Sequence, residues 1–285
     1  MVAGLGSPGG PADAVGMALD APHRADVRTH RIDLGEGAAT TVHVAAYPRA
    51  LVAATVVVLP APEPLAGWCA RTGVRDALVG GFFVTPGGPP LGEVWTGGRR
   101  APTRPFDADY APIRSCLHVD DERVTIAPLG ALPAGPVGDL LQAGPALVAG
   151  GRVLVTDAGD PEGFAAGVSQ FDSDITAGRH PRAALGIDGE RLIAVAGEGR
   201  APGEAGLTLA ELAALMALLG AREAINLDGG GSTSLVIDGR LVNRPREMDG
   251  REVVGGRPLA TALAFVPRAQ PAAATSTGTA LAASA

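Results

Sequence analysis

Lysine is absent from the sequence, because all 23 basic residues among its 285 are arginine. This absence excludes several enzyme classes. P-loop nucleotide hydrolases and protein kinases hold phosphates with a lysine, and pyridoxal enzymes and Schiff-base aldolases react through a lysine amine. Arginine is a poor nucleophile because its guanidinium stays protonated, but it binds phosphate well. We therefore expect any phosphate site here to use arginine and backbone N–H groups.

Cysteine and positive charge are also scarce. The two cysteines, Cys69 and Cys116, form neither a disulfide framework nor a metal-ligand spacing. The net charge of −7 argues against a nucleic-acid partner. No apolar run reaches membrane-spanning length, and the first residues show no pattern of a signal peptide. The sequence thus predicts a cytoplasmic protein that binds neither membrane nor nucleic acid.

Glycine (41 residues) and proline (24 residues) are abundant and fall between short apolar runs, which indicates strands joined by tight turns. Residues 1–27 lack periodicity and are expected to be flexible, and the low-complexity residues 268–285 are expected to be disordered. Residues 28–267 are predicted to form one domain of the α+β class, a mixed, strand-rich fold of hairpins with a few packed helices.

Strands are expected at residues 40–46 and 54–59. Four hairpins are expected further along the chain, at 81–85 with 93–96, 146–148 with 152–155, 183–187 with 191–196, and 234–237 with 240–243. The last two turn on Asp188-Gly189 and Asp238-Gly239. Asp-Gly favours a type I′ turn, in which both central residues have positive φ.

One helix is well specified by its ends. Thr208 and Glu211 have the spacing of a capping box, and Leu207 and Leu212 have that of a hydrophobic staple. Gly220 follows the apolar stripe of this segment and is suited to terminate the helix.

The strongest functional signal is the run NLDGGGSTS at residues 226–234. A short strand expected at 223–227 presents Asp228 to three glycines, which permit positive φ and let a ligand approach the backbone. Successive N–H groups of such a turn can form an anion-binding nest. An ordinary strand-to-hairpin connection is the alternative, but three glycines exceed what a turn requires. The nest and its hydroxyl donor would consist of Gly229, Gly230, Gly231 and Ser232.

Further candidates are weaker when each is taken alone. Arg182 begins a strand and is suited to clamp a phosphate or carboxylate, although a lone arginine is more often a surface charge. Glu198 and Arg200 follow the end of a strand, where a solvated ion pair is the simpler interpretation. Asn243 ends the last hairpin and is equally ambiguous when taken alone. Gly80-Gly81 would allow another backbone or a ligand to approach closely, but could also be the plain start of a strand.

Three other patterns do not support a site. Gly197, Gly199 and Gly203 have the wrong spacing for a dinucleotide fingerprint. Asp172-Ser173-Asp174 begins like a calcium loop, but Ala177 occupies the position that needs glycine. The five histidines are scattered. We therefore expect neither a metal nor a cofactor.

Taken together, these segments resemble the phosphodiester glycosidase family, from about residue 30 to residue 267. The sequence departs from the family pattern at Val79, where asparagine is usual, at Ala183, where threonine is usual, and at Glu198, where aspartate is usual. The matching pieces include Gly80-Gly81-Phe82-Phe83, Gln142-Ala143-Gly144-Pro145, His180-Pro181-Arg182, Glu198-Gly199-Arg200, Asn226-Leu227-Asp228-Gly229-Gly230-Gly231-Ser232, Asn243 and Arg257-Pro258.

The resemblance implies a hydrolase that cleaves the glycosidic bond of a sugar-1-phosphodiester, such as an N-acetylglucosamine-1-phosphodiester, and releases free sugar and a phosphomonoester. It suggests Asp228 and Glu198 as working carboxylates, in the role of general base or nucleophile. Arg182, the three glycines and Ser232 would hold the phosphate, and the sugar site would be lined by Arg200, Asn243, Gly80 and Gly81.

The substrate would thus be a small molecule or glycan that carries a phosphodiester. Because phosphate leaves as a stable anion, its departure depends more on charge stabilisation than on protonation. A non-catalytic phosphosugar-binding protein with the same fold is the alternative, which the apolar residues Val79 and Ala183 favour.

Overall fold

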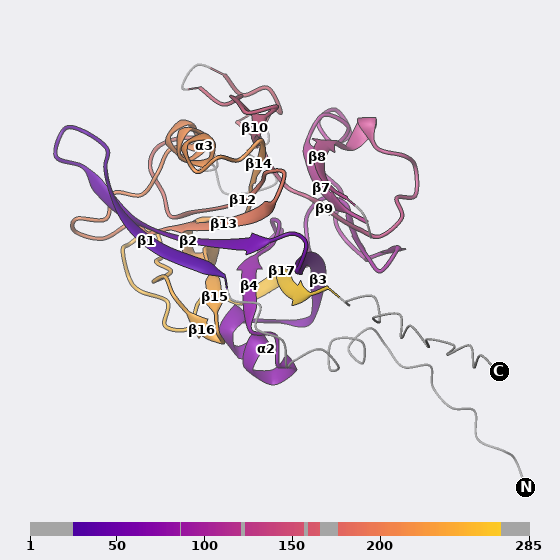
Figure 1. The fold of residues 1–285 in the computed structure, drawn as a ribbon, viewed down its shortest axis with the longest axis horizontal. Helices are drawn as coiled ribbons and strands as arrows, with labels where there is room; N and C mark the ends of the chain where they lie inside the picture. The colour runs from indigo at the N-terminus through magenta and orange to yellow at the C-terminus, as the bar shows by residue number, and fades with distance from the viewer. Residues whose placement is uncertain (1–24, 86, 121–122, 157–158, 166–175, 269–285) are drawn as a thin grey trace, which may run out of the picture.

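The computed structural model describes residues 25–268, apart from 86, 121–122, 157–158 and 166–175. Of the predicted terminal segments 1–27 and 268–285, residues 1–24 and 269–285 lie outside the described residues, as does Asp172-Ser173-Asp174. Asp26 and Val27, expected in the flexible segment, instead begin the first strand. The described part confirms the α+β prediction, because it consists mainly of antiparallel strands arranged in three sheets, with two α-helices (Figure 1).

The largest sheet has seven strands, in the order β1 (Asp26–Asp33), β2 (Ala39–Pro48), β13 (Arg191–Gly197), β12 (Arg182–Ile187), β14 (Glu223–Asn226), β10 (Ala146–Ala149) and β11 (Arg152–Val153). The second has five, in the order β16 (Arg240–Leu241), β15 (Leu235–Ile237), β4 (Asp76–Val79), β17 (Leu259–Pro267) and β3 (Val52–Glu63). The third has the order β6 (Arg99–Arg100), β5 (Val94–Thr96), β9 (Asp139–Gln142), β7 (Ser115–Val119) and β8 (Val124–Pro128).

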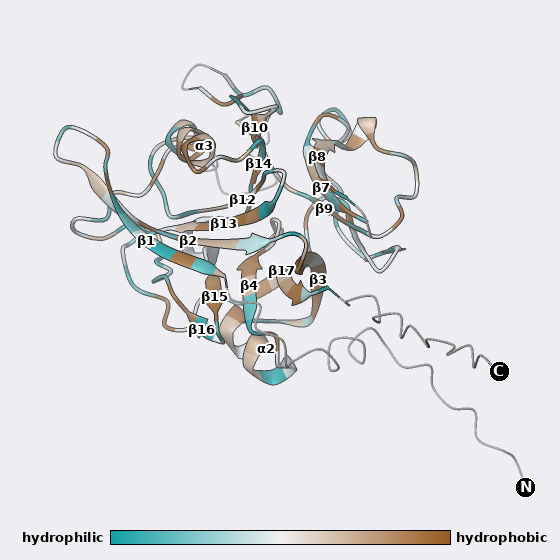
Figure 2. Cartoon of the chain, viewed as in Figure 1, coloured by the Kyte–Doolittle hydropathy of each residue, from teal (hydrophilic) through white to brown (hydrophobic). Residues whose placement is uncertain are grey.

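Alternating side chains of the seven-stranded sheet enter two different cores. Ala183 and Leu185 of β12 join the large cluster shared with β3, β4 and β17, whereas Ala184 joins a smaller cluster with helix α3 (Leu209–Leu218). Helix α2 (Leu65–Thr72) contacts β4 and β15. Figure 2 shows hydrophobic residues along β4, β13 and β15, while the outer strand β1 is largely hydrophilic and exposed. The seven-stranded sheet thus lies between α3 and the second sheet.

The ends of α3 confirm the predicted signals. The hydroxyl of Thr208 accepts the Glu211 N–H at 3.1 Å, and the Glu211 carboxylate accepts the Thr208 N–H at 2.8 Å. Leu207 and Leu212 are both buried in the cluster that α3 forms with the sheet. Gly220 follows the helix with a φ of 91°, which suits glycine.

Thr208→Ala is expected to lower the free energy of unfolding by about 1 kcal/mol, because it removes the side-chain oxygen of the N-cap. Urea unfolding followed by circular dichroism would measure this change. Thr208→Ser is the control and should remain near wild type. An alanine variant as stable as the serine variant would contradict the capping role.

The predicted hairpins are confirmed in part. Asp238 and Gly239 have φ values of 49° and 75°, as a type I′ turn requires. The same prediction is wrong for the turn between β12 and β13, where neither Asp188 nor Gly189 has positive φ. The reason is local, since the Asp188 carboxylate accepts the N–H groups of both Glu190 and Arg191 and so closes a wider turn.

The hairpin predicted at 81–85 with 93–96 is also wrong. Residues 81–85 form only a single bridge, between Phe83 and Pro90. Strand β5 instead pairs with β6, which follows it directly, and with β9, which lies more than 40 residues further along the chain. Long-range pairing in the third sheet therefore overrides the local turn signal.

Candidate active site

Three of the predicted segments meet at one end of the seven-stranded sheet. Strand β12 pairs with β14 through Ala184 and Asn226, and the Leu227 N–H donates to the Ala183 oxygen at 2.9 Å, so Asp228 follows opposite Arg182. On its other side β12 pairs with β13 through Arg182 and Gly197, immediately before Glu198. The sheet thus brings the regions around Arg182, Glu198 and Asp228 together.

Residues 228–232, which we call the glycine loop, lead from β14 to the second sheet. The Asp228 N–H donates to the Gly80 oxygen at 3.1 Å. A Cβ on Gly80 would lie 2.4 Å from Thr261 Oγ1, so only glycine fits between β17 and the loop. The Gly81 N–H donates to the same hydroxyl at 2.9 Å. The Gly80 oxygen therefore anchors Asp228, and the role of Gly80 and Gly81 in lining a sugar site stays a prediction.

Each glycine of the loop is required by a different neighbour. A Cβ on Gly229 would lie 2.9 Å from the Pro181 oxygen. Gly230 has a φ of 59°, and a Cβ there would lie 2.9 Å from Arg200 Nη1. A Cβ on Gly231 would lie 2.9 Å from Arg257 Nη2. The side chains of Arg200 and Arg257 are thus packed directly against the loop.

Arg200 itself has a strained backbone, with a φ of 60°. Non-glycine residues rarely take this conformation, which often marks functional sites. Its guanidinium donates to the Arg246 oxygen at 3.1 Å and lies 3.3 Å from His180 Nδ1. The strained backbone of Arg200 therefore places its guanidinium beside Gly230.

The predicted anion nest is only partly present. The Gly229 N–H donates to Asp228 Oδ1 at 2.9 Å, and the Gly230 N–H donates to the Pro181 oxygen at 2.9 Å. These bonds anchor the turn and use two of the three donors expected for phosphate. Of the three, only the Gly231 N–H has no hydrogen-bond acceptor among the described residues. The prediction of a nest from all three glycines is therefore corrected to one N–H group.

Unpaired buried oxygens are concentrated in and beside the glycine loop. Buried polar atoms nearly always have a hydrogen-bond partner, so each exception calls for an explanation. In the part of the chain that the structure describes, five side-chain oxygens between residues 226 and 234 are buried without such a partner, namely Asn226 Oδ1, Asp228 Oδ2, Ser232 Oγ, Thr233 Oγ1 and Ser234 Oγ. This concentration indicates a place where a polar ligand completes the hydrogen bonding.

Asp228 has the electrostatics of a reactive carboxyl group. Burial raises the pKa of Asp228 from 3.8 to about 6, and the nearby Ser232 hydroxyl, the Gly229 N–H and the charge of Arg257 limit the rise. A raised pKa favours a carboxyl group that carries its proton close to neutral pH. This carboxyl group thus lies beside the Ser232 hydroxyl, and neither Asp228 Oδ2 nor Ser232 Oγ has a hydrogen-bond partner of good geometry among the described residues.

Glu198 is buried beside the loop and is held on one side. Its Oε1 accepts the Arg244 N–H at 2.9 Å and lies 3.2 Å from His43 Nε2. No other described residue donates a hydrogen bond to this carboxylate. Glu198 and Asp228 therefore occupy different environments.

Two candidates are bonded to the protein's own backbone. Arg182 is buried, and its guanidinium donates to the Leu207 oxygen at 3.1 Å and the Gly178 oxygen at 3.4 Å. The Asn243 amide accepts the Leu235 N–H at 2.9 Å and donates to the Thr233 oxygen at 2.8 Å. Arg182 therefore braces the segment before β12 and Asn243 braces the segment after the glycine loop, while their predicted contacts with phosphate and sugar stay predictions.

The two apolar departures from the family pattern have a packing explanation. Val79 and Ala183 are 1% and 0% exposed and belong to the large hydrophobic cluster between the sheets. Their side chains complete this core, so they are not evidence for a lost ligand contact.

Sequence reasoning missed Arg257 and its partner Glu247. The guanidinium of Arg257 makes an ion pair with Glu247, and both side chains border the position that a Cβ on Gly231 would occupy. Arg257-Pro258 matched the family pattern, but this match did not indicate that Arg257 contacts Gly231. The hydroxyls of Thr233 and Ser234 follow the glycines in the sequence, but their order did not indicate that both are buried at the site.

Other kinds of site have less support. No group of three or more His, Cys, Asp or Glu side chains within the described residues is placed to hold a metal ion. No helix in the same part of the chain is long and apolar enough to cross a membrane.

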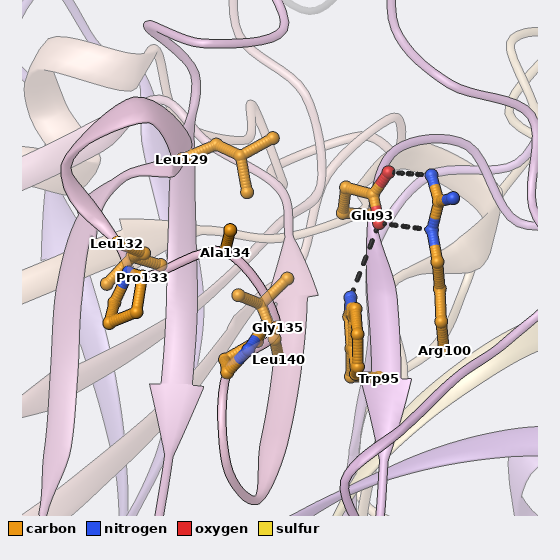
Figure 3. Close-up of a pocket in the computed structure, with 10 residues that line it drawn as sticks. Glu93, Trp95, Arg100, Leu129, Leu132, Pro133, Ala134, Gly135 and Leu140 are labelled. Atoms are coloured by element: carbon orange, nitrogen blue, oxygen red, sulfur yellow. Dashed lines mark hydrogen bonds and ion pairs between the residues drawn. The ribbon is translucent and has the colours of Figure 1, made fainter.

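A cavity of about 320 Å³ lies on the third sheet, away from every predicted site residue. Figure 3 shows that Glu93 on its wall is bonded to both Trp95 and Arg100, while Leu129 and Leu140 supply apolar surface. Because its charged groups satisfy one another, we place the candidate active site at the glycine loop.

The fold is similar to several solved structures. The catalytic domain of zebrafish N-acetylglucosamine-1-phosphodiester alpha-N-acetylglucosaminidase, auto-inhibited by its pro-peptide, matches with a TM-score of 0.67 and 19% identity, over 87% of this chain and 85% of that one. A hypothetical protein from Synechocystis matches with a TM-score of 0.56 and 20% identity over 85% of this chain, which spans 62% of the Synechocystis chain. A Burkholderia pseudomallei protein matches with a TM-score of 0.58 and 19% identity, over 80% and 74% of the two chains.

At these identities the solved structures establish the fold alone. Comparison with curated protein sequences gives no match. The sequence profile of the phosphodiester glycosidases matches residues 72–266, which include the glycine loop, Glu198, Arg200 and Arg257. The chain therefore belongs to the phosphodiester glycosidase family.

Proposed function

We propose that this protein hydrolyses the bond between the anomeric carbon of a sugar, such as N-acetylglucosamine, and the oxygen of a phosphodiester. The products are the free sugar and a phosphomonoester. The observation that carries the proposal is the group of unpaired buried oxygens on residues 226–234, bordered by two guanidinium groups. A ligand with several hydroxyls and one anionic phosphate supplies the partners that these groups lack.

Asp228 acts as the general acid in this proposal, which replaces the role of general base or nucleophile expected from the sequence. Its raised pKa and its unpaired Oδ2 suit a group that donates a proton to the departing phosphate oxygen. Glu198 acts on the sugar as general base or nucleophile, because an ionised carboxylate suits either role.

The phosphate is held by Arg200, Arg257, the Gly231 N–H and the Ser232 hydroxyl. Arg257 is also ion-paired with Glu247, which lowers the net positive charge that it presents to the phosphate. Charge that develops on the leaving phosphate is stabilised by these fixed donors, which need no reorganisation during the reaction.

The proposal is tested by incubating purified protein with GlcNAc-phospho-methylmannoside and measuring release of free sugar. We expect sugar release that depends on Glu198 and Asp228. Binding of this compound by calorimetry without hydrolysis of it or of any other glycosyl phosphodiester would select the non-catalytic alternative instead.

The rate should depend on the protonation of Asp228. We expect kcat to fall as the pH rises through about 6, because the general acid then loses its proton. A pH profile of kcat from pH 4.5 to 8.5 would measure this limb. A profile that instead rises through pH 6 would show that ionised Asp228 is the active form and would contradict the general-acid role.

A further inference from the structure

His43 lies behind Glu198, in a place that the sequence did not single out. It belongs to β2, where it is paired with Ala196 of β13, two residues before Glu198. The side chains of His43 and Glu198 are only 14% and 9% exposed, and Nε2 lies 3.2 Å from Oε1. The imidazole is therefore a mostly buried neighbour of a candidate catalytic carboxylate.

The second ring nitrogen of His43 also has a partner. Thr29 lies directly opposite His43 on the outer strand β1, and its hydroxyl is 3.2 Å from Nδ1. A chain of contacts thus leads from the exposed strand β1 through the imidazole to Glu198.

For a neutral imidazole, the chemistry of these groups sets the direction of both hydrogen bonds. An ionised carboxylate can only accept, so the nitrogen facing Glu198 must carry a proton. In a neutral imidazole the other nitrogen is then an acceptor. The Thr29 hydroxyl therefore donates to Nδ1, and Nε2–H of His43 donates to Oε1 of Glu198.

The consequence for Glu198 is that its two oxygens differ. Oε1 receives bonds from His43 and from the Arg244 N–H, and no described residue donates to Oε2. An aspartate, shorter by one C–C bond of about 1.5 Å, would not reach both donors from the same backbone position.

We propose that His43 is a positioning residue for the reaction, held in its Nε2–H tautomer by Thr29. It orients Glu198 so that Oε2 is the oxygen that acts on the sugar side of the bond. This inference rests on the proposed function, since it assigns Glu198 a part in the hydrolysis. Hydrogen bonds that orient metal-ligating side chains from behind are commonly worth about 10-fold to 100-fold in activity. We expect an effect of the same size for a carboxylate oriented in the same way.

Substitutions that preserve or remove the donor test the proposal. His43→Leu is expected to lower kcat about 10-fold to 100-fold with little change in KM. His43→Gln keeps an N–H donor and should recover most of this loss. Thr29→Val should lower kcat less than His43→Leu, and Thr29→Ser should match wild type. A leucine variant with wild-type kcat, or a glutamine variant as slow as leucine, would overturn the proposal.

A double mutant asks whether His43 acts through Glu198. Glu198→Asp should lower kcat, and adding His43→Leu should cost little more, because both changes remove the same contact. Fully multiplicative losses would show that His43 acts elsewhere and would overturn the inference.

The tautomer of His43 is measurable without any substrate. Long-range ¹H–¹⁵N correlation spectra of the imidazoles, with His43 assigned by its absence in His43→Gln, should show the Nε2–H form. The Nδ1–H form would overturn the positioning geometry. If wild type hydrolyses no glycosyl phosphodiester although His43 has the Nε2–H form, the proposed function has failed and the catalytic role of His43 falls with it, while the pairing stands.

Discussion

Asp228→Asn is expected to lower kcat for a glycosyl phosphodiester by about 100-fold, because asparagine keeps the shape of the side chain but cannot transfer the proton. The loss stays at this level because phosphate leaves as a stable anion and needs protonation less than an alcohol does. Binding should survive, since Arg200, Arg257 and the Gly231 N–H are unchanged. Measuring turnover by sugar release and affinity by calorimetry separates the two effects. The control is Asp238→Asn, which makes the same chemical change in an exposed turn, where asparagine tolerates the φ of 49°.

The same variant has an expected effect on stability. The carboxyl group of Asp228 keeps its proton in the folded protein up to a pKa of about 6, but in the unfolded chain only up to about 3.8. The unfolded chain thus binds fewer protons between these values, so the stability that this group contributes falls as the pH rises through this range. Asp228→Asn should remove this slope. Equal turnover by wild type and Asp228→Asn would contradict the catalytic assignment.

Gly230→Ala is expected to lower kcat/KM about 100-fold. Its added methyl group would lie 2.9 Å from Arg200 Nη1, and the guanidinium must move to make room. A displacement near 1 Å in a positioning group commonly costs about this much activity. The φ of 59° adds a cost of about 1–2 kcal/mol in folding free energy.

Gly239→Ala is the matched control for this second experiment. Gly239 also has positive φ, 75°, but a Cβ there would have no neighbour within 4 Å. It should therefore lose a similar amount of stability in urea unfolding while its kcat/KM stays near wild type. If both variants lost activity equally, backbone strain and not the displaced arginine would be the cause, and the role of Arg200 would be refuted.

Local signals explain the parts of the fold that were predictable. The capping box at Thr208 and the Asp238-Gly239 turn depend on neighbours within a few residues, and both are present as predicted. Strand β17 shows the opposite case. Its partners β3 and β4 lie about 180 to 210 positions earlier, as the pairs of Leu263 with Val56 and Leu78 show. No local turn pattern in the sequence predicts pairing over such a separation.

The residues of the candidate site also fall into a part that was predictable from local sequence and a part that was not. Asp228 and the three glycines were identified from one continuous segment, because their residue types and order carry the signal. Arg257 and His43 were not, because each reaches the site through a contact across strands or loops. The use of Gly229 and Gly230 as backbone anchors was equally invisible, since it depends on Asp228 and Pro181 as acceptors.

The most direct test of the account is a crystal structure of Asp228→Asn with intact GlcNAc-phospho-methylmannoside. We predict that the phosphate lies at the glycine loop, bonded to the Gly231 N–H and the Ser232 hydroxyl and facing Arg200 or Arg257. The anomeric carbon should then lie between residue 228 and Glu198. A phosphate bound elsewhere, for example in the cavity beside Trp95 and Arg100, would contradict the assignment of the active site.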